Sequence, residues 1–402
     1  MLCRSIASIL RTSGDLYRRL DVNLQGMVPV VTPGDSAVTA MHLGDLQCWA
    51  QARAPYVHEL TLRVTDGWEL LAGVTLERLL RACSGTQTLY IHHLGGYKHW
   101  LPSIFELRHL RELTVTAGST WVRLPQEFCH LTNLERLTIQ MRIEGGRQVA
   151  QGFVPIELLS CIRLKHLSFI GCQGLFLPPV VGELMALESL TVNDTDWADT
   201  REAIHQATFQ RGSFSTFSLT ALDLSSCNLD ALPFQMCHLE KLESLVLSDN
   251  NLCDVPRLLA AFLRRLRFID LSRNRFKRIP PVLAALTGLQ SVDLSGNVDL
   301  EVSPPDTRGE RNAASRPLQH SLSLTQLVYA LPELRSLNVR KAANDRDSRR
   351  PDLWTPACYS SLSEIMRAMR KHSPWCNLET FVCDPVPMPH DSTSWLGTAL
   401  AE

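Results

Sequence analysis

The sequence lacks the composition of a membrane-spanning or nucleic-acid-binding protein. Its 402 residues contain no apolar run that approaches the roughly 20 residues needed to cross a bilayer. Basic and acidic residues nearly balance, at 40 Lys and Arg against 41 Asp and Glu, so the formal net charge is -1. Since nucleic acids and anionic membranes attract proteins mainly through basic charge, we expect neither as a partner.

The sequence also lacks the short motifs that mark common catalytic and cofactor sites. It contains no GxxxxGK[ST] phosphate loop, no HExxH zinc pattern and no GxSxG nucleophile turn. None of its 12 cysteines has the CxxC spacing of a zinc ligand pair. We therefore expect no enzyme activity, no cofactor and no metal site.

The N-terminus has no long apolar stretch of the kind that forms a secretory signal. The cysteines are spread along the whole chain, which favours a reducing compartment and predicts a cytoplasmic protein. The first residues contain Arg4 and Arg11 and no acid before Asp15, a composition that also suits a mitochondrial presequence. A short capping helix explains the same residues, so mitochondrial localisation stays open as the alternative.

What the sequence does contain is a periodic leucine pattern. Its clearest copy, residues 242–250, reads LESLVLSDN, or LxxLxLxxN, and the pattern recurs at 266–274 and 289–297. Weaker copies lie on both sides, and from Leu60 to Val292 the second apolar positions follow one another at steps of 23–32 residues. These positions are Leu60, Leu89, Leu113, Leu137, Leu167, Leu190, Leu222, Leu245, Ile269, Val292, Leu337 and, less clearly, Phe381.

Each copy predicts a short strand followed by a short helix. The alternation Leu245-Val-Leu247 directs both leucines inward and the residue between them outward. Asn250, Asn274 and Asn297 end their strands, where an amide can hydrogen-bond main-chain groups of the neighbouring coil. The return segments begin with Leu-Pro, Val-Pro or Ile-Pro, and proline suits the first turn of a helix.

These motifs resemble the leucine-rich-repeat family, continuously from about residue 57 to residue 297. The LPxx form of the repeat is similar to the intracellular, roughly 23-residue class typified by Ras-binding scaffolds of the Shoc-2 and plant Ras-group type. The resemblance implies an α/β fold, a right-handed solenoid or horseshoe with a parallel concave sheet and short convex helices. It also implies a cytoplasmic signalling scaffold.

The rhythm of the repeat divides the chain into three regions. Residues 1–55 are predicted to form an N-terminal helical cap, with disorder as the alternative for its start, and residues 56–303 to form the repeats. Residues 304–402 are predicted to hold flexible loops, irregular terminal repeats and a cap. The further elements expected are helices at about 36–53, 69–82, 323–330 and 361–371, loops at 304–317 and 340–351, a last strand at 377–383, and an end to regular structure at 385–389.

The outward strand residues are the candidate partner-binding residues. In the C-terminal half of the repeats they are aspartates and serines: Asp223, Ser225, Asp270, Ser272, Asp293 and Ser295. A stripe of aspartates across parallel strands could clamp a basic peptide. Leu-Asp-Leu-Ser is also the commonest sequence at these positions of the repeat, and exposed charges on strands are usually only solvated. A peptide-binding stripe and an ordinary solvated repeat surface therefore both remain open.

The N-terminal half offers aromatic and histidine residues instead. Tyr90, His92 and Trp100 are expected to cluster at one strand edge, with Trp121 one coil later, and interfaces favour such aromatic anchors. Three histidines within residues 92–99 could hold a metal. Neighbouring strand residues point to opposite faces, however, and no carboxylate or cysteine joins them at ligand spacing, so a contact surface is expected.

We therefore predict a non-enzymatic scaffold that holds a protein partner on the concave face of the solenoid. The resemblance implies a small GTPase or a phosphatase as partner. A substrate-recognition subunit of a ubiquitin ligase, contacting a ligase adaptor, is one alternative, because residues 154–162 faintly resemble an F-box opening. A mitochondrial assembly or RNP-associated factor is the other, and it rests on the N-terminal segment.

Overall fold

In the computed structural model the chain divides into two compact units, Met1–Ser218 and Leu219–Glu402. The structure describes residues 18–23, 30–33, 39–40, 56–63, 76–94, 101–117, 125–141, 152–153, 156–172, 175–176, 184–194, 218–232, 236, 239–301, 322–341, 356–371, 376–383, 386–388 and 391–396. Within these residues, no helix combines the length and apolarity that a membrane span requires.

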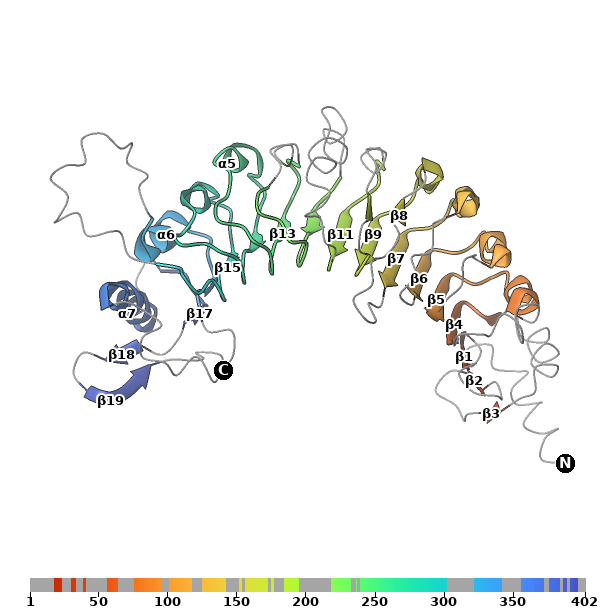
Figure 1. Ribbon diagram of the computed structural model, residues 1–402, viewed down its shortest axis with the longest axis horizontal. Coiled ribbons are helices and arrows are strands. Elements are labelled where there is room, and N and C mark those ends of the chain that lie inside the picture. Colours follow the sequence, from red (N-terminus) through yellow and green to blue (C-terminus); the bar gives the residue numbers. More distant parts are fainter. Residues whose placement is uncertain are drawn as a thin grey trace. The chain divides into compact units, whose positions relative to one another are not determined.

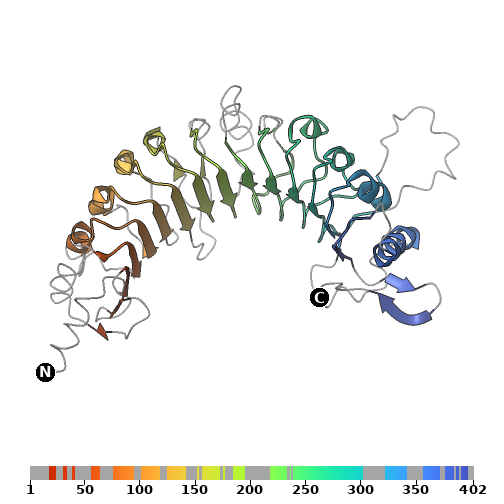
Figure 2. The same ribbon diagram turned by 180° about the vertical axis from the view of Figure 1, so that it is seen from behind.

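The first unit is a series of strands that lie side by side (Figures 1 and 2). The parallel strands are β1 (Arg19–Asn23), β4 (Glu59–Arg63), β5 (Thr88–Leu94), β6 (Glu112–Ala117), β7 (Arg136–Met141), β9 (His166–Ile170) and β11 (Ser189–Asn193), in that spatial order. Beyond β1, the antiparallel strands β2 (Val30–Pro33) and β3 (Thr39–Ala40) extend the series. A separate parallel pair joins β8 (Gly152–Phe153) to β10 (Leu175–Phe176).

Equivalent repeat positions pair from strand to strand, which places the leucines of all copies in one core. Leu113 of β6 lies opposite Leu89 of β5 and Leu137 of β7, and each of the three is fully buried. Burying one leucine contributes about 1.5–3 kcal/mol. The intervening residues are half-exposed on the other side, which we call the open face of the sheet.

The return segments of unit 1 are short helices on the opposite side from the open face (Figure 2). They are η3 (Pro102–Glu106), η4 (Gln126–His130), η5 (Ile156–Ser160) and the helical residues 76–82. Proline starts η3, as the Leu-Pro motif predicts. The rings of Phe105 and Phe128 pack at a centroid distance of 5.3 Å and join neighbouring turns.

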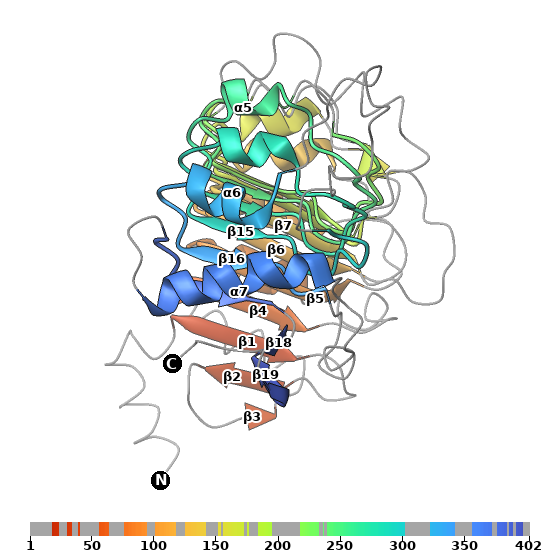
Figure 3. The same ribbon diagram turned by 90° about the vertical axis from the view of Figure 1, so that its left-hand side faces the viewer.

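The second unit repeats this arrangement with shorter strands (Figures 1 and 3). Its parallel strands are β12 (Ala221–Asp223), β13 (Ser244–Val246), β14 (Phe268–Asp270), β15 (Ser291–Asp293), β16 (Ser336–Asn338) and β17 (Thr380–Val382). Its helices are α5 (Leu259–Phe262), η10 (Pro281–Ala285), α6 (Leu324–Ala330) and α7 (Pro356–Arg370). The antiparallel strands β18 (Val386–Met388) and β19 (Asp391–Leu396) follow.

Asparagine side chains link the coils of unit 2 as the repeat pattern predicts. The buried Asn274 amide donates to the carbonyls of Leu247, Leu271 and Ser272 at 2.9, 3.1 and 3.0 Å. Its Oδ1 accepts the N–H of Leu252 at 3.0 Å. One side chain therefore satisfies main-chain groups of two successive coils, and Asn250 and Asn297 do the same.

Cysteine replaces this asparagine in two copies. The thiol of Cys172 lies 3.7 Å from the carbonyl of Ile139 and 3.6 Å from that of Ile170, in the manner of the asparagine amide. Cys227 is fully buried and its thiol lies 3.3 Å from the carbonyl of Ser225. Neither of these two cysteines forms a disulfide.

Most of the element predictions for the C-terminal region are confirmed. The expected helices at 323–330 and 361–371 are α6 and α7, and the strand expected at 377–383 is β17. Regular structure does not end at 385–389, because β18 and β19 pair there. The loop segment 304–317 lies outside the described residues, as do residues 342–351 of the loop predicted at 340–351.

In the region predicted as a helical cap, the described residues form strands. Within 1–55 these are β1, β2 and β3, while residues 41–55 lie outside the described residues. The helix expected at 36–53 therefore does not include Thr39–Ala40, which pair with β2. β1 pairs in parallel with β4 and buries Leu20 and Val22, so it extends the repeat strands by one position. Of the helix expected at 69–82, residues 76–82 are described and are helical.

Candidate functional site

The open face of unit 1 carries a row of hydroxyl side chains. Its middle outward positions pair from strand to strand in the predicted register. They are Thr61, Tyr90, Thr114, Thr138, Ser168 and Thr191, and all are half-exposed. Asp21 of β1 pairs with Thr61 and adds a carboxylate to the row, a residue that the sequence prediction missed because β1 was not expected.

Tyr90 is the one aromatic side chain in this row. Its hydroxyl lies 3.5 Å from Oε1 of Glu112. Burial raises the pKa of Tyr90, and the negative charges of Glu112 and Glu59 add to the effect. Tyr90 therefore stays protonated and can donate a hydrogen bond at neutral pH.

Of the other predicted residues of the N-terminal cluster, the structure describes only His92. His92 is half-buried and pairs with Arg63 of β4, beside an irregularity between Ile91 and Leu94. Trp100 and Trp121 lie outside the described residues. In the described part of the chain, no group of three His, Cys, Asp or Glu side chains is placed to hold a metal ion.

Ion pairs cross the first two parallel strands of unit 1. Nε of Arg19 lies 2.9 Å from a carboxylate oxygen of Glu59, and Nε of Arg63 lies 3.1 Å from a carboxylate oxygen of Asp21. All four side chains are partly exposed, so these pairs stabilise the fold only weakly. They neutralise this end of the open face.

The open face of unit 2 carries the predicted aspartates in register. Asp223 lies opposite Val246, Val246 opposite Asp270, Asp270 opposite Asp293, and Asp293 opposite Asn338. All five side chains are half-exposed. The structure therefore brings Asp223, Asp270 and Asp293 onto one face, with Val246 between the first two.

Each aspartate uses one carboxylate oxygen to close the turn after its strand. Oδ1 of Asp223 accepts the N–H and the hydroxyl of Ser225 at 3.0 and 2.7 Å. Oδ1 of Asp270 accepts the N–H of Ser272 at 2.9 Å, and Oδ1 of Asp293 accepts that of Ser295 at 2.8 Å. The aspartates therefore have a structural role in the repeat.

The second carboxylate oxygens distinguish the three aspartates. Oδ2 of Asp293 accepts the side-chain amide of Asn338 at 2.9 Å. Within the described residues, no side-chain amide donates to Oδ2 of Asp223 or of Asp270. Asp223 and Asp270 thus each present one acceptor to the open face, on either side of Val246.

Asp270 differs from an ordinary aspartate in its protonation. Burial raises its pKa above the usual 3.8, hydrogen bonds from Ser272 oppose this, and the charges of Asp293 and Asp249 add to the rise. Burial thus makes the charged form of Asp270 less favourable than in water. A cation beside the carboxylate would offset part of this cost, because an opposite charge favours the ionised form.

The three serines of the predicted set differ in how far they are exposed to solvent. Ser225 and Ser295 are half-exposed, but Ser272 is only 9% exposed and supports the carboxylate of Asp270. Phe268, two residues before Asp270, is half-exposed on the same open face. Sequence reasoning missed it because it took the aspartate and the serine two residues later but not the outward position before the aspartate, although the same alternation predicts that position.

Comparison with known families supports the repeat interpretation. The leucine rich repeat family matches residues 240–298, which include β13, β14 and β15. This segment also contains the three copies of the pattern that end in asparagine, one of which, residues 242–250, fits LxxLxLxxN in full. The match therefore coincides with the part of the chain whose asparagines link successive coils.

Similar proteins share the repeats over part of their length. The volume-regulated anion channel subunit LRRC8A of Rattus norvegicus is 27% identical over 236 residues, which are 57% of this chain and 27% of that protein. The protein flightless-1 homolog of Caenorhabditis elegans is 32% identical over 144 residues, 36% of this chain and 11% of that protein. The chain thus matches about a quarter or less of the length of these relatives.

Solved structures show the same fold. A leucine-rich-repeat protein of Leptospira interrogans superposes with a TM-score of 0.53 at 19% identity, covering 83% of this chain and 73% of that one. An internalin of Listeria monocytogenes superposes with a TM-score of 0.50 at 13% identity, covering 87% and 85%. Together with the asparagine hydrogen bonds, these likenesses show that the chain has an α/β leucine-rich-repeat solenoid fold.

Proposed function

We propose that the chain is a non-enzymatic interaction protein that binds a basic segment of a partner protein on the open face of unit 2. Leucine-rich-repeat folds generally serve as interaction scaffolds, with binding on their extended outward strand residues. The observation that carries the proposal is the pair of carboxylates, Asp223 and Asp270, that flanks Val246 with one acceptor oxygen each.

The spacing of these carboxylates suits a single long cationic side chain. Parallel strands lie about 4.8 Å apart, so two strand intervals place Asp223 and Asp270 roughly 10 Å apart. A lysine or arginine stem packed over Val246 would then put its cationic group within reach of either carboxylate. Phe268 lies on the same face and offers an apolar contact beside this position.

The partly buried setting of Asp270 makes it the stronger of the two determinants. A charge pair gains more energy where water is partly excluded than at a fully solvated surface. Asp293 is the weakest determinant, because both of its oxygens already accept hydrogen bonds within the chain.

Selection from a random peptide library displayed on phage, with the full chain as bait, tests this function. We expect enriched peptides that contain a basic residue next to an apolar one. Their affinity should fall at least tenfold for the Asp223→Asn/Asp270→Asn variant, since about 1.4 kcal/mol corresponds to a factor of ten. The exposed Asp299→Asn serves as the matched control and should bind normally.

Enriched peptides without basic residues would contradict the proposal, and so would peptides that bind the double variant as well as the wild type. Asparagine keeps an Oδ1 acceptor for the serine N–H, so the variant removes charge and leaves the turn intact. Near-native thermal unfolding of the variant checks this point.

We also propose that the repeats belong to the roughly 23-residue LPxx class and that the protein acts in cytoplasmic signalling. The proline-started turns η3 and η10 and the 23- and 24-residue spacing from Leu222 to Val292 support the class. The free thiols among the described cysteines support a reducing compartment. Microscopy of the full chain carrying a C-terminal tag tests the location, and a mitochondrial signal would contradict it.

A further inference from the structure

The helical side of unit 2 exposes large apolar side chains. Leu258 and Phe262, at the start and end of α5, are 62% and 39% exposed, and Tyr329 of α6 is 73% exposed. The turn η10 packs against both α5 and α6 and lies between them (Figure 3). These three side chains therefore belong to neighbouring elements on one side of the unit.

The exposed residues within these three elements carry no charge. The outward residues of α5, η10 and α6, with Leu258 just before α5, are uncharged, and we call them the apolar stripe. They are Leu258, Ala261, Phe262, Pro281, Ala285, Gln326 and Tyr329. Exposed apolar side chains that gather on neighbouring elements mark interaction sites more often than scattered single residues do.

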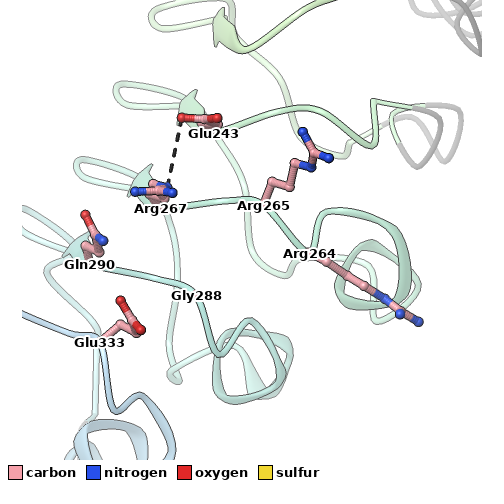
Figure 4. Close-up of a pocket in the computed structure, with 7 residues that line it drawn as sticks. All are labelled: Glu243, Arg264, Arg265, Arg267, Gly288, Gln290 and Glu333. Carbon is pink, nitrogen blue, oxygen red and sulfur yellow. Dashed lines mark ion pairs between the residues drawn. The ribbon is translucent and has the colours of Figure 1, made fainter.

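A cluster of arginines borders the stripe where α5 ends. The turn after α5 holds Arg264, Arg265 and Arg267, which line a cavity of about 350 Å³ together with Glu243, Gly288, Gln290 and Glu333 (Figure 4). Gly288 supplies no side chain to fill this space. The arginines therefore border a hollow open to solvent.

Acidic neighbours satisfy these arginines only in part. Nε of Arg267 lies 4.0 Å from a carboxylate oxygen of Glu243, at the limit of an ion pair (Figure 4). Arg264 follows the stripe residue Phe262 by two positions, and its Nε donates to the carbonyl of Ala261 at 3.0 Å. In the part of the chain that the structure describes, neither Arg257 nor Arg265 has an ion-pair partner, and both are exposed.

The local charge of this coil is strongly positive. Residues 257–278 contain eight basic residues and one acid, Asp270, whereas the whole chain has a net charge of -1. The lining of the hollow is positive overall, because three arginines face two glutamates, Glu243 and Glu333, and it favours an acidic partner and disfavours a basic one.

We propose that the apolar stripe and the arginine turn form one docking site for an acidic amphipathic helix of a partner protein. Leu258, Phe262 and Tyr329 receive the apolar face of that helix, as helix-in-groove complexes do with residues at i, i+3, i+4 and i+7. Carboxylates on its polar face pair with Arg264 and Arg265, whose planar guanidinium groups bind carboxylates in bidentate fashion. Aromatic and arginine side chains are also the residues that dominate interface energetics.

This site is separate from the open face of unit 2 and prefers the opposite charge. The open face presents Asp223 and Asp270 to a basic segment, and the helical side presents arginines to an acidic one. A partner of one surface is therefore repelled by the other, and the two can be occupied independently.

A displayed library of 16-residue amphipathic peptides tests the site, with the full chain as bait. Its apolar positions vary among Leu, Ile, Phe, Met and Trp, its polar positions are Glu, Asp or Gln, and a second library replaces the acids with Lys and Arg. We expect enrichment from the acidic library only. Enriched peptides should bind at least tenfold more weakly to Arg264→Glu/Arg265→Glu and to Phe262→Ala/Tyr329→Ala.

Two controls distinguish this site from other surfaces. Val298→Ala removes an apolar side chain that is 66% exposed outside the stripe and should leave binding unchanged. Asp223→Asn/Asp270→Asn should also leave it unchanged, so a failure of the proposed basic-segment site does not affect this result. Thermal unfolding of each variant confirms that these surface changes leave the fold intact.

The proposal is overturned if the basic library is enriched, or if neither library is. It is also overturned if enriched peptides ignore the arginine and stripe variants. Sedimentation of the chain alone tests a second copy as the occupant. A dimer that the Phe262→Ala/Tyr329→Ala variant abolishes would show that the stripe mediates self-association.

Discussion

At the residue scale, the asparagines at the strand ends make more hydrogen bonds per side chain than the other described residues of unit 2. Asn274 alone makes four, at 2.9–3.1 Å, and is 7% exposed. Replacing it leaves the buried N–H of Leu252 without a partner and removes one of the two hydrogen bonds that each of three carbonyls accepts. Such unsatisfied groups cost more than the net worth of one exposed hydrogen bond.

We predict that Asn274→Ala lowers the free energy of unfolding by about 3 kcal/mol, measured by urea denaturation. Asn377→Ala is the matched control, because its amide makes one exposed hydrogen bond to the carbonyl of Pro332 at 2.7 Å. It should cost no more than about 1 kcal/mol. Equal losses for the two variants would contradict the role assigned to Asn274.

The raised pKa of Asp270 predicts how pH affects stability. The folded chain holds the Asp270 proton more tightly than the unfolded chain, because burial disfavours the charged form. Asp270 therefore opposes folding above its raised pKa, and this cost disappears as the pH falls through that pKa toward 3.8. Relative to Asp270→Asn, the wild type should gain stability as the pH falls over this range, in urea denaturation at a series of pH values. A loss would contradict the assignment.

At the element scale, α6 begins with a complete capping box. Ser323 Oγ accepts the N–H of Gln326 at 3.2 Å, and Oε1 of Gln326 accepts the N–H of Ser323 at 2.9 Å. We predict that Ser323→Ala lowers the free energy of unfolding by about 1 kcal/mol. Ser323→Asp should keep most of the wild-type stability, because aspartate is also a favoured N-cap residue. The exposed Thr287→Ala should have little effect. Chemical denaturation measures all three, and an unchanged Ser323→Ala variant would contradict the cap.

The same scale shows why some elements could be predicted from the sequence and others could not. Strands such as β13 could be predicted because Leu245 and Leu247 form a period-two pattern that recurs along the chain. β1 offers only Leu20 and Val22, too short a pattern to distinguish from a helix or loop, and its partner β4 lies 40 residues away. Nonlocal pairing, which no local pattern records, decides such strands.

The candidate site was predictable to a similar degree. The period of the strands placed Asp223, Asp270 and Asp293 on one face, and the structure confirms that placement. Whether the second carboxylate oxygen of each aspartate accepts a hydrogen bond depends on the neighbouring coil. There, the side-chain amide of Asn338 donates to Asp293 but not to Asp223 or Asp270. The apolar stripe was not predicted, because it depends on which helical residues of three separate coils face solvent.

At the scale of the whole molecule, the repeats bury most of the described cysteines in both units. Cys83, Cys161, Cys172 and Cys227 are fully buried, and burial raises the pKa of Cys83 and of Cys161 to about 12. Cys253 is exposed. Since the thiolate is the reactive form, burial protects the four thiols both sterically and electrostatically.

We therefore predict that iodoacetamide modifies Cys253 in the native chain, and that the four buried thiols react only after unfolding. Peptide mass spectrometry of native and urea-unfolded samples measures each site. Rapid native modification of Cys161 or Cys172 would contradict the packing of the repeats. The Cys253→Ser variant is the control, because its native sample should lose the signal assigned to that cysteine.

The central claim is that the open face of unit 2 binds a protein through a basic segment. Its most direct test places a photo-crosslinking amino acid at Val246 in the full chain in cells, with and without Asp223→Asn/Asp270→Asn, and identifies the adducts by mass spectrometry. We predict adducts at position 246 whose crosslinked peptides carry lysine or arginine, and which the double variant loses. If position 246 yields no adduct, or yields adducts that persist without the carboxylates, the claim is contradicted.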